Sequence, residues 1–295
     1  IGELDNLRQM KIGAVFQFEI PPYIALNRDG STVTRLAQCT SISQLKNTRY
    51  KVEGLSYRAN IPANVDFYIS QNKTDYNLAN DPQFNSLADF ANNIAREYVV
   101  VINAGVLINA STTANFAFTQ GAFPSGSTFK LINAGEIIGA GGDGGNGGFA
   151  FWEQGLPDPT TSNGNDGSDG GSALSISTDA VIDNLTGLIA GAGAGEQGKF
   201  SSAGSLPQYN IAGRGGNGGA GSVPGAGGSA GGYDSGSTVY GDDGKNGYKT
   251  FAEPNAGNLG ESTLTASAGD AIHKNGNNVT IVAGVNDNQI KGDIV

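Results

Sequence analysis

Residues 131–148 read LINAGEIIGAGGDGGNGG, and they carry the strongest structural signal in the chain. Its first half alternates as a β-strand does, whereas from Gly139 onward two of every three residues are glycine. A three-residue period is that of the polyproline II helix, which has three residues per turn and no internal hydrogen bonds. The stretch therefore predicts a strand that continues into an extended rod with two edges lacking side chains.

The same glycine period returns several times, and 34 of the 47 glycines lie between residues 135 and 248. A lone glycine run is expected to be a flexible linker, because glycine loses much conformational entropy on ordering. Several rods in one phase can instead bond sideways through their free N–H and C=O groups. We therefore predict a polyglycine II bundle over residues 139–248. The glycines expected to pack on neighbouring backbones are Gly139, Gly142, Gly145, Gly148, Gly213, Gly216 and Gly219.

The strand INAGEIIGAGG (132–142), the repeated GGxGG blocks and the variable segments between them resemble a known family. It is the family of glycine-rich receptor-binding adhesins at the tips of bacteriophage tail fibres, and the resemblance covers about residues 98–295. It implies a polyglycine II sandwich on the virion whose loops bind a receptor on the host surface. The implied partners are a bacterial outer-membrane protein or surface glycan and the rest of the tail fibre. The chain would act as a homotrimer or as a monomer at a fibre tip.

Outside the rods, the sequence predicts a mainly β protein with little helix. Residues 1–97 are expected to form a β-rich attachment domain, with strands at 14–20, 23–26, 31–36, 50–55 and 65–69. One helix is predicted over residues 86–96. Ser86 and Asp89 have the spacing of a capping box, and apolar residues recur there at helical intervals, which is typical of core packing.

An internal sequence repeat predicts that residues 98–140 form stacked β rungs. Residues 101–110 align with 131–140 without a gap, and residues 182–191 align with them with one extra residue. Asn103, Asn133 and Asn184 would then occupy equivalent turns with an architectural role. Residues 249–295 are expected to supply closing strands at 263–266, 279–283 and 289–295, which return to the layer formed by the rungs.

The segments between the glycine runs carry aromatic residues in an otherwise side-chain-poor region. If the rods are antiparallel, alternate loops emerge at one end and form a receptor-binding tip, because Tyr and Trp are enriched in binding loops. The alternative is that these side chains fold back and plug the end of the bundle. The residues concerned are Phe149, Phe151, Trp152, Phe200, Tyr209, Tyr233 and Tyr240.

The charge distribution limits the partners. The chain has a net charge of −10, and residues 136–261 alone hold 4 basic and 14 acidic side chains. Nucleic acid is excluded as a partner, because phosphate binding requires clustered Lys and Arg. An acidic surface instead favours a neutral or basic protein loop over an anionic polysaccharide.

The sequence predicts no catalytic residues, no metal site and no cofactor. The only histidine, His273, lies in AIHKNGNN without a nucleophile motif, and a single cysteine, Cys39, leaves too few zinc ligands. The glycine blocks also lack the spacing of calcium and nucleotide motifs.

Two alternative functions remain open. The pairs Asp166–Asp169 and Asp242–Asp243 leave a tail-spike-like polysaccharide-binding or depolymerising protein as one alternative. An ice-binding protein is a weaker one, because the residues on the third edge of the rods are irregular.

Overall fold

The structure is a computed structural model of the 295-residue chain, which divides into two compact units, Ile1–Val65 and Asp66–Val295. It describes residues 15–20, 33–45, 49–57, 65–148, 150–151, 160–161, 164–184, 186–199, 215–229, 232–233, 239–240, 244–249, 255–286 and 288–295. Strands far outnumber helices among the described elements, in agreement with the predicted mainly β class.

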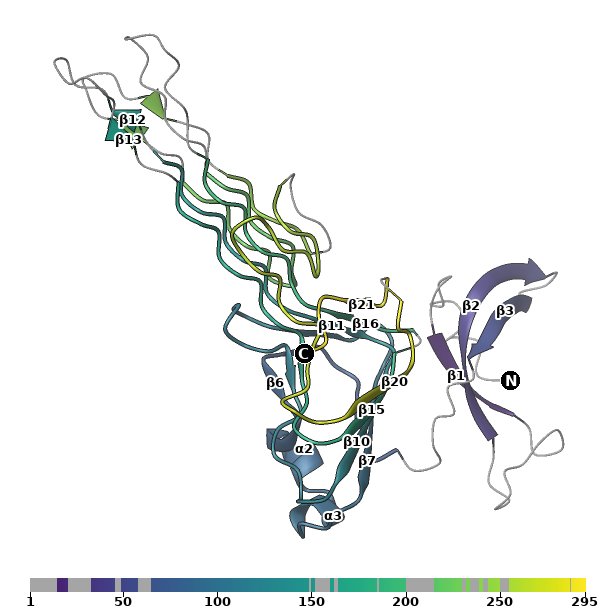
Figure 1. The fold of residues 1–295 in the computed structure, drawn as a ribbon. Helices are drawn as coiled ribbons and strands as arrows, with labels where there is room; N and C mark the ends of the chain where they lie inside the picture. Colours follow the sequence, from purple (N-terminus) through teal and green to yellow (C-terminus); the bar gives the residue numbers. More distant parts are fainter. Residues whose placement is uncertain are drawn as a thin grey trace. The chain divides into compact units, whose positions relative to one another are not determined.

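The first unit holds an antiparallel sheet of three strands in the order β1-β2-β3 (Figure 1). These are β1 (Val15–Ile20), β2 (Val33–Leu45) and β3 (Arg49–Tyr57). A β-bulge between Cys39 and Ser41 interrupts the pairing of β2 with β3. Each strand overlaps a predicted one, although β2 extends nine residues beyond the predicted end at Leu36. The strand predicted at 23–26 lies outside the described residues.

The second unit contains three sheets in which every pair of strands is parallel. The first sheet holds β4 (Phe67–Ile69), β7 (Glu97–Ile102), β10 (Thr128–Asn133), β15 (Ala180–Asp183) and β20 (Val279–Ala283). The second holds β5 (Lys73–Thr74), β8 (Leu107–Asn109), β11 (Glu136–Ile138), β16 (Leu188–Ala190) and β21 (Ile290–Lys291). The third holds β6 (Tyr76–Asn77), β9 (Phe118–Thr119), β14 (Leu174–Ser175) and β19 (Ile272–His273). The chain visits the three sheets in turn, so each circuit is one rung of a β-solenoid.

Apolar columns fill the interior between the three sheets. One column runs through Val100, Leu131 and Ile182, which are register partners on neighbouring strands and fully buried. Phe118, Leu174 and Ile272 form the corresponding column of the third sheet. Such parallel strands are buried on the inner face along their whole length, which explains their Val- and Ile-rich composition.

The predicted repeats correspond to stacked rungs, but one of the two alignments has the wrong register. Leu131 pairs with Val100 and Ile137 with Ile108, so the turn after β7 is two residues longer than the turn after β10. The gap-free alignment missed this difference. The other alignment is correct, because Leu131 pairs with Ile182 and Ile137 with Ile189, with one extra residue between them.

Two of the three predicted turn asparagines stack inside the solenoid. The Asn133 Nδ2 donates to Asn184 Oδ1 at 2.8 Å, and Asn184 Nδ2 donates to the Gln289 carbonyl oxygen at 2.9 Å. Both asparagine side chains are buried, so these bonds satisfy polar groups that water does not reach. Asn103 lies outside this ladder because the longer turn after β7 displaces it.

The helix predicted over residues 86–96 is present only in part, and a second helix that was not predicted precedes it. The structure has a 3₁₀ turn, η1 (Leu78–Asn80), and two short helices, α2 (Pro82–Asn85) and α3 (Ala88–Ala91). The first helix begins earlier because Asp81 Oδ1 accepts hydrogen bonds from the Gln83 and Phe84 amides. The second ends early, and Asn93 lies beyond it in the left-handed region at φ 56°. None of the described helices is long and apolar enough to cross a membrane.

The boundary predicted after residue 97 also differs from the structure, which divides the chain after Val65. The segment 66–97 belongs to the solenoid because β4 pairs in parallel with β7. Phe84 is fully buried and packs edge to face on Phe67 and Phe90, which closes this end of the core. Amphipathic spacing alone could not show which core the helical segment covers.

The closing strands predicted near the C-terminus are present in part. β20 matches the predicted strand at 279–283, and β21 lies within 289–295. Residues 263–266 form a bend instead of a strand: Thr263 Oγ1 donates to the Gly195 carbonyl oxygen at 3.0 Å and also accepts the Ala266 amide. This bend lies against the glycine region.

Arg96 holds the start of the solenoid together. Its Nη1 and Nη2 donate to the two carboxylate oxygens of Asp66 at 3.0 and 2.8 Å, and its Nε donates to Asp89 at 2.7 Å. These hydrogen bonds, that to Asp66 first, raise the pKa of the Arg96 guanidinium above its ordinary value. The guanidinium also lies 4.2 Å from the centre of the Tyr98 ring.

We expect Arg96→Lys to lower the free energy of unfolding by about 1–2 kcal/mol, because an ammonium group cannot bridge both carboxylates. Urea unfolding of the wild type, Arg96→Lys, Asp66→Asn and the double variant measures the coupling. The double variant should lose less than the two single losses together. Strict additivity would show that the bidentate pair contributes nothing to stability.

Candidate functional site

The glycine region is inserted into the solenoid at two consecutive rungs. Residues 139–173 connect β11 to β14, and residues 191–271 connect β16 to β19. Figure 1 shows these segments running side by side away from the sheets. Their described glycine-rich parts are rod 1 (139–148), rod 2 (164–171), rod 3 (191–199), rod 4 (215–221), rod 5 (223–229) and rod 6 (244–248).

The rods bond to one another at every third residue. In rod 1, the amides of Gly142 and Gly145 donate to the carbonyl oxygens of Gly193 and Glu196 in rod 3, at 3.0 and 2.9 Å. The amides of rod 4 donate back to rod 1, where Gly216 bonds to the Gly145 carbonyl oxygen at 2.7 Å. The described rods contain no backbone hydrogen bond within a rod, and the lateral period of three is that of polyglycine II.

The described glycines of the predicted set lie where backbones touch. A Cβ on Gly139, Gly142, Gly145, Gly216 or Gly219 would overlap a carbonyl oxygen of a neighbouring segment. Gly148 is buried and its amide donates to the Lys199 carbonyl oxygen at 3.3 Å. Gly213 lies outside the described residues. Such contact allows the rods to approach closely enough for lateral hydrogen bonds.

The third edge of rod 1 carries side chains that take part in the bonding. Asp143 Oδ1 accepts the Ala226 amide at 2.7 Å, and Asn146 Oδ1 accepts the Ser229 amide at 2.9 Å. Both side chains are nevertheless largely exposed. The irregular residues on this edge therefore supply acceptors for amides of rod 5 that have no carbonyl partner.

The outward ends of three rods lie next to one another. Rods 1, 3 and 5 are parallel, while rods 2, 4 and 6 return antiparallel to them. At the outward end the Gly148 amide donates to Lys199, and the Gly147 amide donates to Ser229 at 2.9 Å. The loops at 149–163, 200–214 and 230–243 therefore leave the bundle from adjacent positions. This arrangement follows from the alternation of rod directions.

The predicted aromatic residues fall mainly outside the described part of the chain. Four of them lie outside the described residues: Phe149, Trp152, Phe200 and Tyr209. For three others the backbone is described: Phe151 lies in β12 (Ala150–Phe151), Tyr233 in β17 (Gly232–Tyr233) and Tyr240 in β18 (Val239–Tyr240). The strand β12 pairs antiparallel with β13 (Thr160–Thr161), and β17 pairs antiparallel with β18. In two of the three loops, a short strand near the start therefore pairs with a short strand near the end.

Of the two carboxylate pairs considered for sugar cleavage, the described pair forms hydrogen bonds with neighbouring segments. Asp166 Oδ1 accepts Gln197 Nε2 at 2.8 Å, and Asp169 Oδ1 accepts the Ser267 amide at 2.6 Å. Asp242 and Asp243 lie outside the described residues. The described part of the chain holds no group of three or more His, Cys, Asp or Glu residues placed to bind a metal ion.

Sequence reasoning missed two buried polar residues inside the bundle. Glu196 is 5% exposed and Asn217 is 1% exposed, and the Asn217 amide donates to Glu196 Oε2 at 3.1 Å. The signal for Glu196 was present, because it is the one carboxylate in GAGAGEQGK (191–199). A carboxylate in a segment of glycine and alanine was a sign that this position differs from the rest of the rod.

Residues 64–295 match the protein family described as "Phage tail fibre adhesin Gp38". The chain belongs to this family. The resemblance stated from the sequence is confirmed, and the match also includes residues 64–97, which the predicted boundary had left out. The matched region begins where the second structural unit begins, to within two residues.

This Gp38-family adhesin is also similar to one solved structure, the gp37-gp38 adhesin tip complex of the bacteriophage S16 long tail fiber. The two chains are 18% identical, with a TM-score of 0.39, and the alignment covers 78% of this chain and 82% of that chain. No curated protein sequence matches the chain.

Membership in the family places the protein at the tail tip of a virion, acting at the host surface as a receptor-binding adhesin. The described fold suits this role, because a rigid support holds three loops at its outer end. Loops on a fixed scaffold are where binding residues concentrate, since they vary without disturbing the core.

Proposed function

We propose that this Gp38-family adhesin binds an outer-membrane protein of its host through the three loops at 149–163, 200–214 and 230–243. The adjacency of Gly148, Lys199 and Ser229 at the outward ends of rods 1, 3 and 5 supports this proposal, because it makes the three loops neighbours. A receptor that contacts one loop base is therefore within reach of the others.

The scaffold suits binding by variable loops. Each described rod forms lateral hydrogen bonds with at least two neighbouring rods, and rod 1 bonds to rods 2, 3, 4 and 5. A rigid support lowers the entropy lost on binding, because only the loops have to be ordered. The aromatic residues of the loops can then supply contact area with few rotatable bonds.

The charge of the bundle favours a protein receptor. The excess of acidic residues over 136–261 repels phosphate-rich surface polysaccharide within about 10 Å at moderate salt. A neutral or basic extracellular loop meets no such repulsion.

We assign residues 1–65 to attachment to the rest of the fibre. They form a separate unit and lie almost wholly outside the region matched by the adhesin family. Cross-linking in intact virions should join lysines of this unit to another fibre protein. Cross-links confined to residues 66–295 would show that the second unit makes the attachment.

Binding of the purified chain to susceptible cells, before and after protease treatment that leaves surface sugar chains intact, tests the nature of the receptor. We expect binding to be lost after the treatment. Binding that survives would identify a glycan receptor and contradict the proposal. The next assay would then look for released sugar fragments, as a depolymerase requires.

A further inference from the structure

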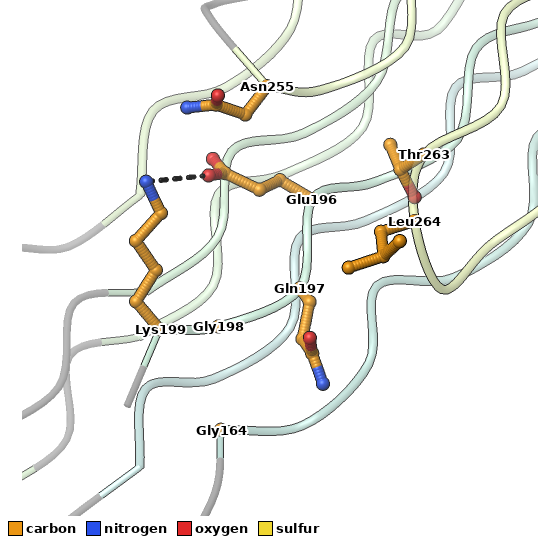
Figure 2. A pocket seen from close by; sticks show the side chains of 8 residues that line it. All are labelled: Gly164, Glu196, Gln197, Gly198, Lys199, Asn255, Thr263 and Leu264. Atoms are coloured by element: carbon orange, nitrogen blue, oxygen red, sulfur yellow. Dashed lines mark ion pairs between the residues drawn. The ribbon is translucent and has the colours of Figure 1, made fainter. Parts of the chain in front are cut away.

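The flank of the glycine bundle holds a pocket of about 560 Å³ (Figure 2). It lies at the base of two of the proposed receptor-binding loops, because Gly164 follows the loop 149–163 and Lys199 precedes the loop 200–214. The bend at Thr263 and Leu264 forms part of the opposite wall. This pocket could not be predicted from the sequence, because its residues come from segments up to 100 positions apart.

A buried carboxylate faces this pocket. Glu196 is 5% exposed, and its Oε2 accepts the Asn217 amide at 3.1 Å. Its other oxygen, Oε1, is buried and accepts no hydrogen bond from the described residues. A buried acceptor left without a hydrogen bond destabilises the folded state, and more so when it is charged. The carboxylate therefore has unused capacity for a strong donor.

Among the described residues, one cation lies near Glu196, and it is weakly held. Lys199 Nζ lies 3.4 Å from Glu196 Oε1, whereas charge-assisted N–H···O bonds are about 2.7–2.9 Å long. The Lys199 side chain is 53% exposed, so the ammonium group can leave the carboxylate for water at little cost. Figure 2 shows the ion pair reaching across one side of the pocket, where a second cation could replace it.

The lining also includes an exposed apolar side chain at the bend formed by residues 263–266. Leu264 is 96% exposed, which is unusual for a leucine, and it lines the same pocket. A ligand with a cationic end and an aliphatic stem would contact both features, as arginine and lysine side chains do. A sugar is a poorer fit because none of the described lining side chains is aromatic. An anion is repelled by Glu196.

We propose that this pocket binds a basic side chain of the receptor polypeptide, an arginine in the first place. The guanidinium group would donate to Glu196 Oε1 and displace Lys199, while its methylene groups lie along Leu264. Arginine suits the site better than lysine, because Asn255 also lines the pocket and the guanidinium fork has donors for its amide oxygen as well as for the carboxylate. The inference rests on the proposed function, since it supplies one contact of a protein receptor.

A titration of the purified full chain followed by amide NMR tests the inference directly. The probes are N-acetyl-arginine methylamide and its uncharged analogue N-acetyl-citrulline methylamide. We expect the arginine probe to shift the amides of Gln197, Gly198 and Lys199 saturably, with an affinity roughly tenfold above that of citrulline. Equal shifts with both probes would overturn the inference, and stronger shifts with a methyl glycoside would identify a sugar site.

Two variants change the binding in opposite directions. Glu196→Gln should remove the preference for arginine, whereas Lys199→Met should raise the affinity for the arginine probe several-fold by removing the internal competitor. Asp143→Asn is the matched control, because it removes an exposed carboxylate of the same bundle and keeps its acceptor oxygen. If Glu196→Gln does not fold, the test rests on Lys199→Met. An unchanged or weaker affinity of that variant for the arginine probe contradicts the inference.

Cell adsorption separates this inference from the proposed function. We expect Glu196→Gln to weaken adsorption by roughly tenfold, while loop variants abolish it. If the Glu196→Gln variant adsorbs normally while the loop variants lose adsorption, the pocket takes no part in receptor binding and the loops do. Adsorption to protease-treated cells would overturn the proposed function whatever the pocket binds in solution.

Discussion

Gly216→Val is expected to lower the free energy of unfolding by more than about 3 kcal/mol and to abolish cell adsorption. A Cβ on Gly216 would overlap the carbonyl group of Glu196 and the backbone of Gln197. Neither is the movable end of a side chain, so rods 3 and 4 would have to separate. That separation breaks the backbone bonds between these two rods, from the Glu196 amide to Asn217 and from the Gly193 amide to Ala220. Gly145→Val should lower the free energy of unfolding in the same way, because its Cβ would overlap the Asn165 carbonyl oxygen.

Asn165→Val is the matched control for both glycine variants. It places the same β-branched residue on a rod of the same bundle, at a position whose side chain is exposed. Urea unfolding should leave Asn165→Val within about 1 kcal/mol of the wild type, since exposed substitutions have small effects. If Gly145→Val and Gly216→Val unfold at the wild-type urea concentration, the glycine runs are linkers and the lateral bonds contribute nothing.

Replacing Trp152, Tyr209 or Tyr240 by Ala is expected to abolish cell adsorption with a nearly unchanged melting temperature. Aromatic residues at the centre of an interface commonly contribute more than about 2 kcal/mol each, which is roughly a thirtyfold loss of affinity. The stability should not change, because the lateral hydrogen bonds of the rods involve none of these side chains. Adsorption to cells and thermal unfolding are measured on the same preparations.

Tyr68→Ala is the control for the loop variants. Tyr68 is an aromatic residue of β4 that is 45% exposed, and it belongs to the first sheet of the solenoid. Its replacement should change neither adsorption nor the melting temperature by much. Loop variants that melt several degrees lower but still adsorb would show that their side chains plug the bundle end instead of binding the receptor.

The glycine bundle could be predicted because its pattern is local and repetitive. Each Gly-Gly-x block defines the same three edges, so the sequence alone shows which edges can touch another backbone. It does not show which rod meets which. Rod 1 contacts rods 2, 3, 4 and 5, and these neighbours are set by where β11 and β16 end in the solenoid.

The register of the rungs shows the limit of pattern reasoning. Asn133 and Asn184 could be placed in one column, whereas Asn103 was placed there wrongly, because the turn after β7 is longer. The helix predicted over residues 86–96 is present only in part for a similar reason. Asp81 starts a helix upstream and Asn93 lies in the left-handed region past α3, two local features that outweigh an apolar period.

Composition and residue period were enough to predict a β-rich part, a bundle of glycine rods and an acidic surface. That the bundle grows from two rungs of a solenoid, and that three loops leave it side by side, became visible only in the folded chain. The pocket around Glu196 also arises only there, since it forms where segments far apart in the sequence pack together. The physical reason is that a period fixes the edges of a rod, whereas its neighbours are selected by hydrogen bonds and backbone contacts between distant segments.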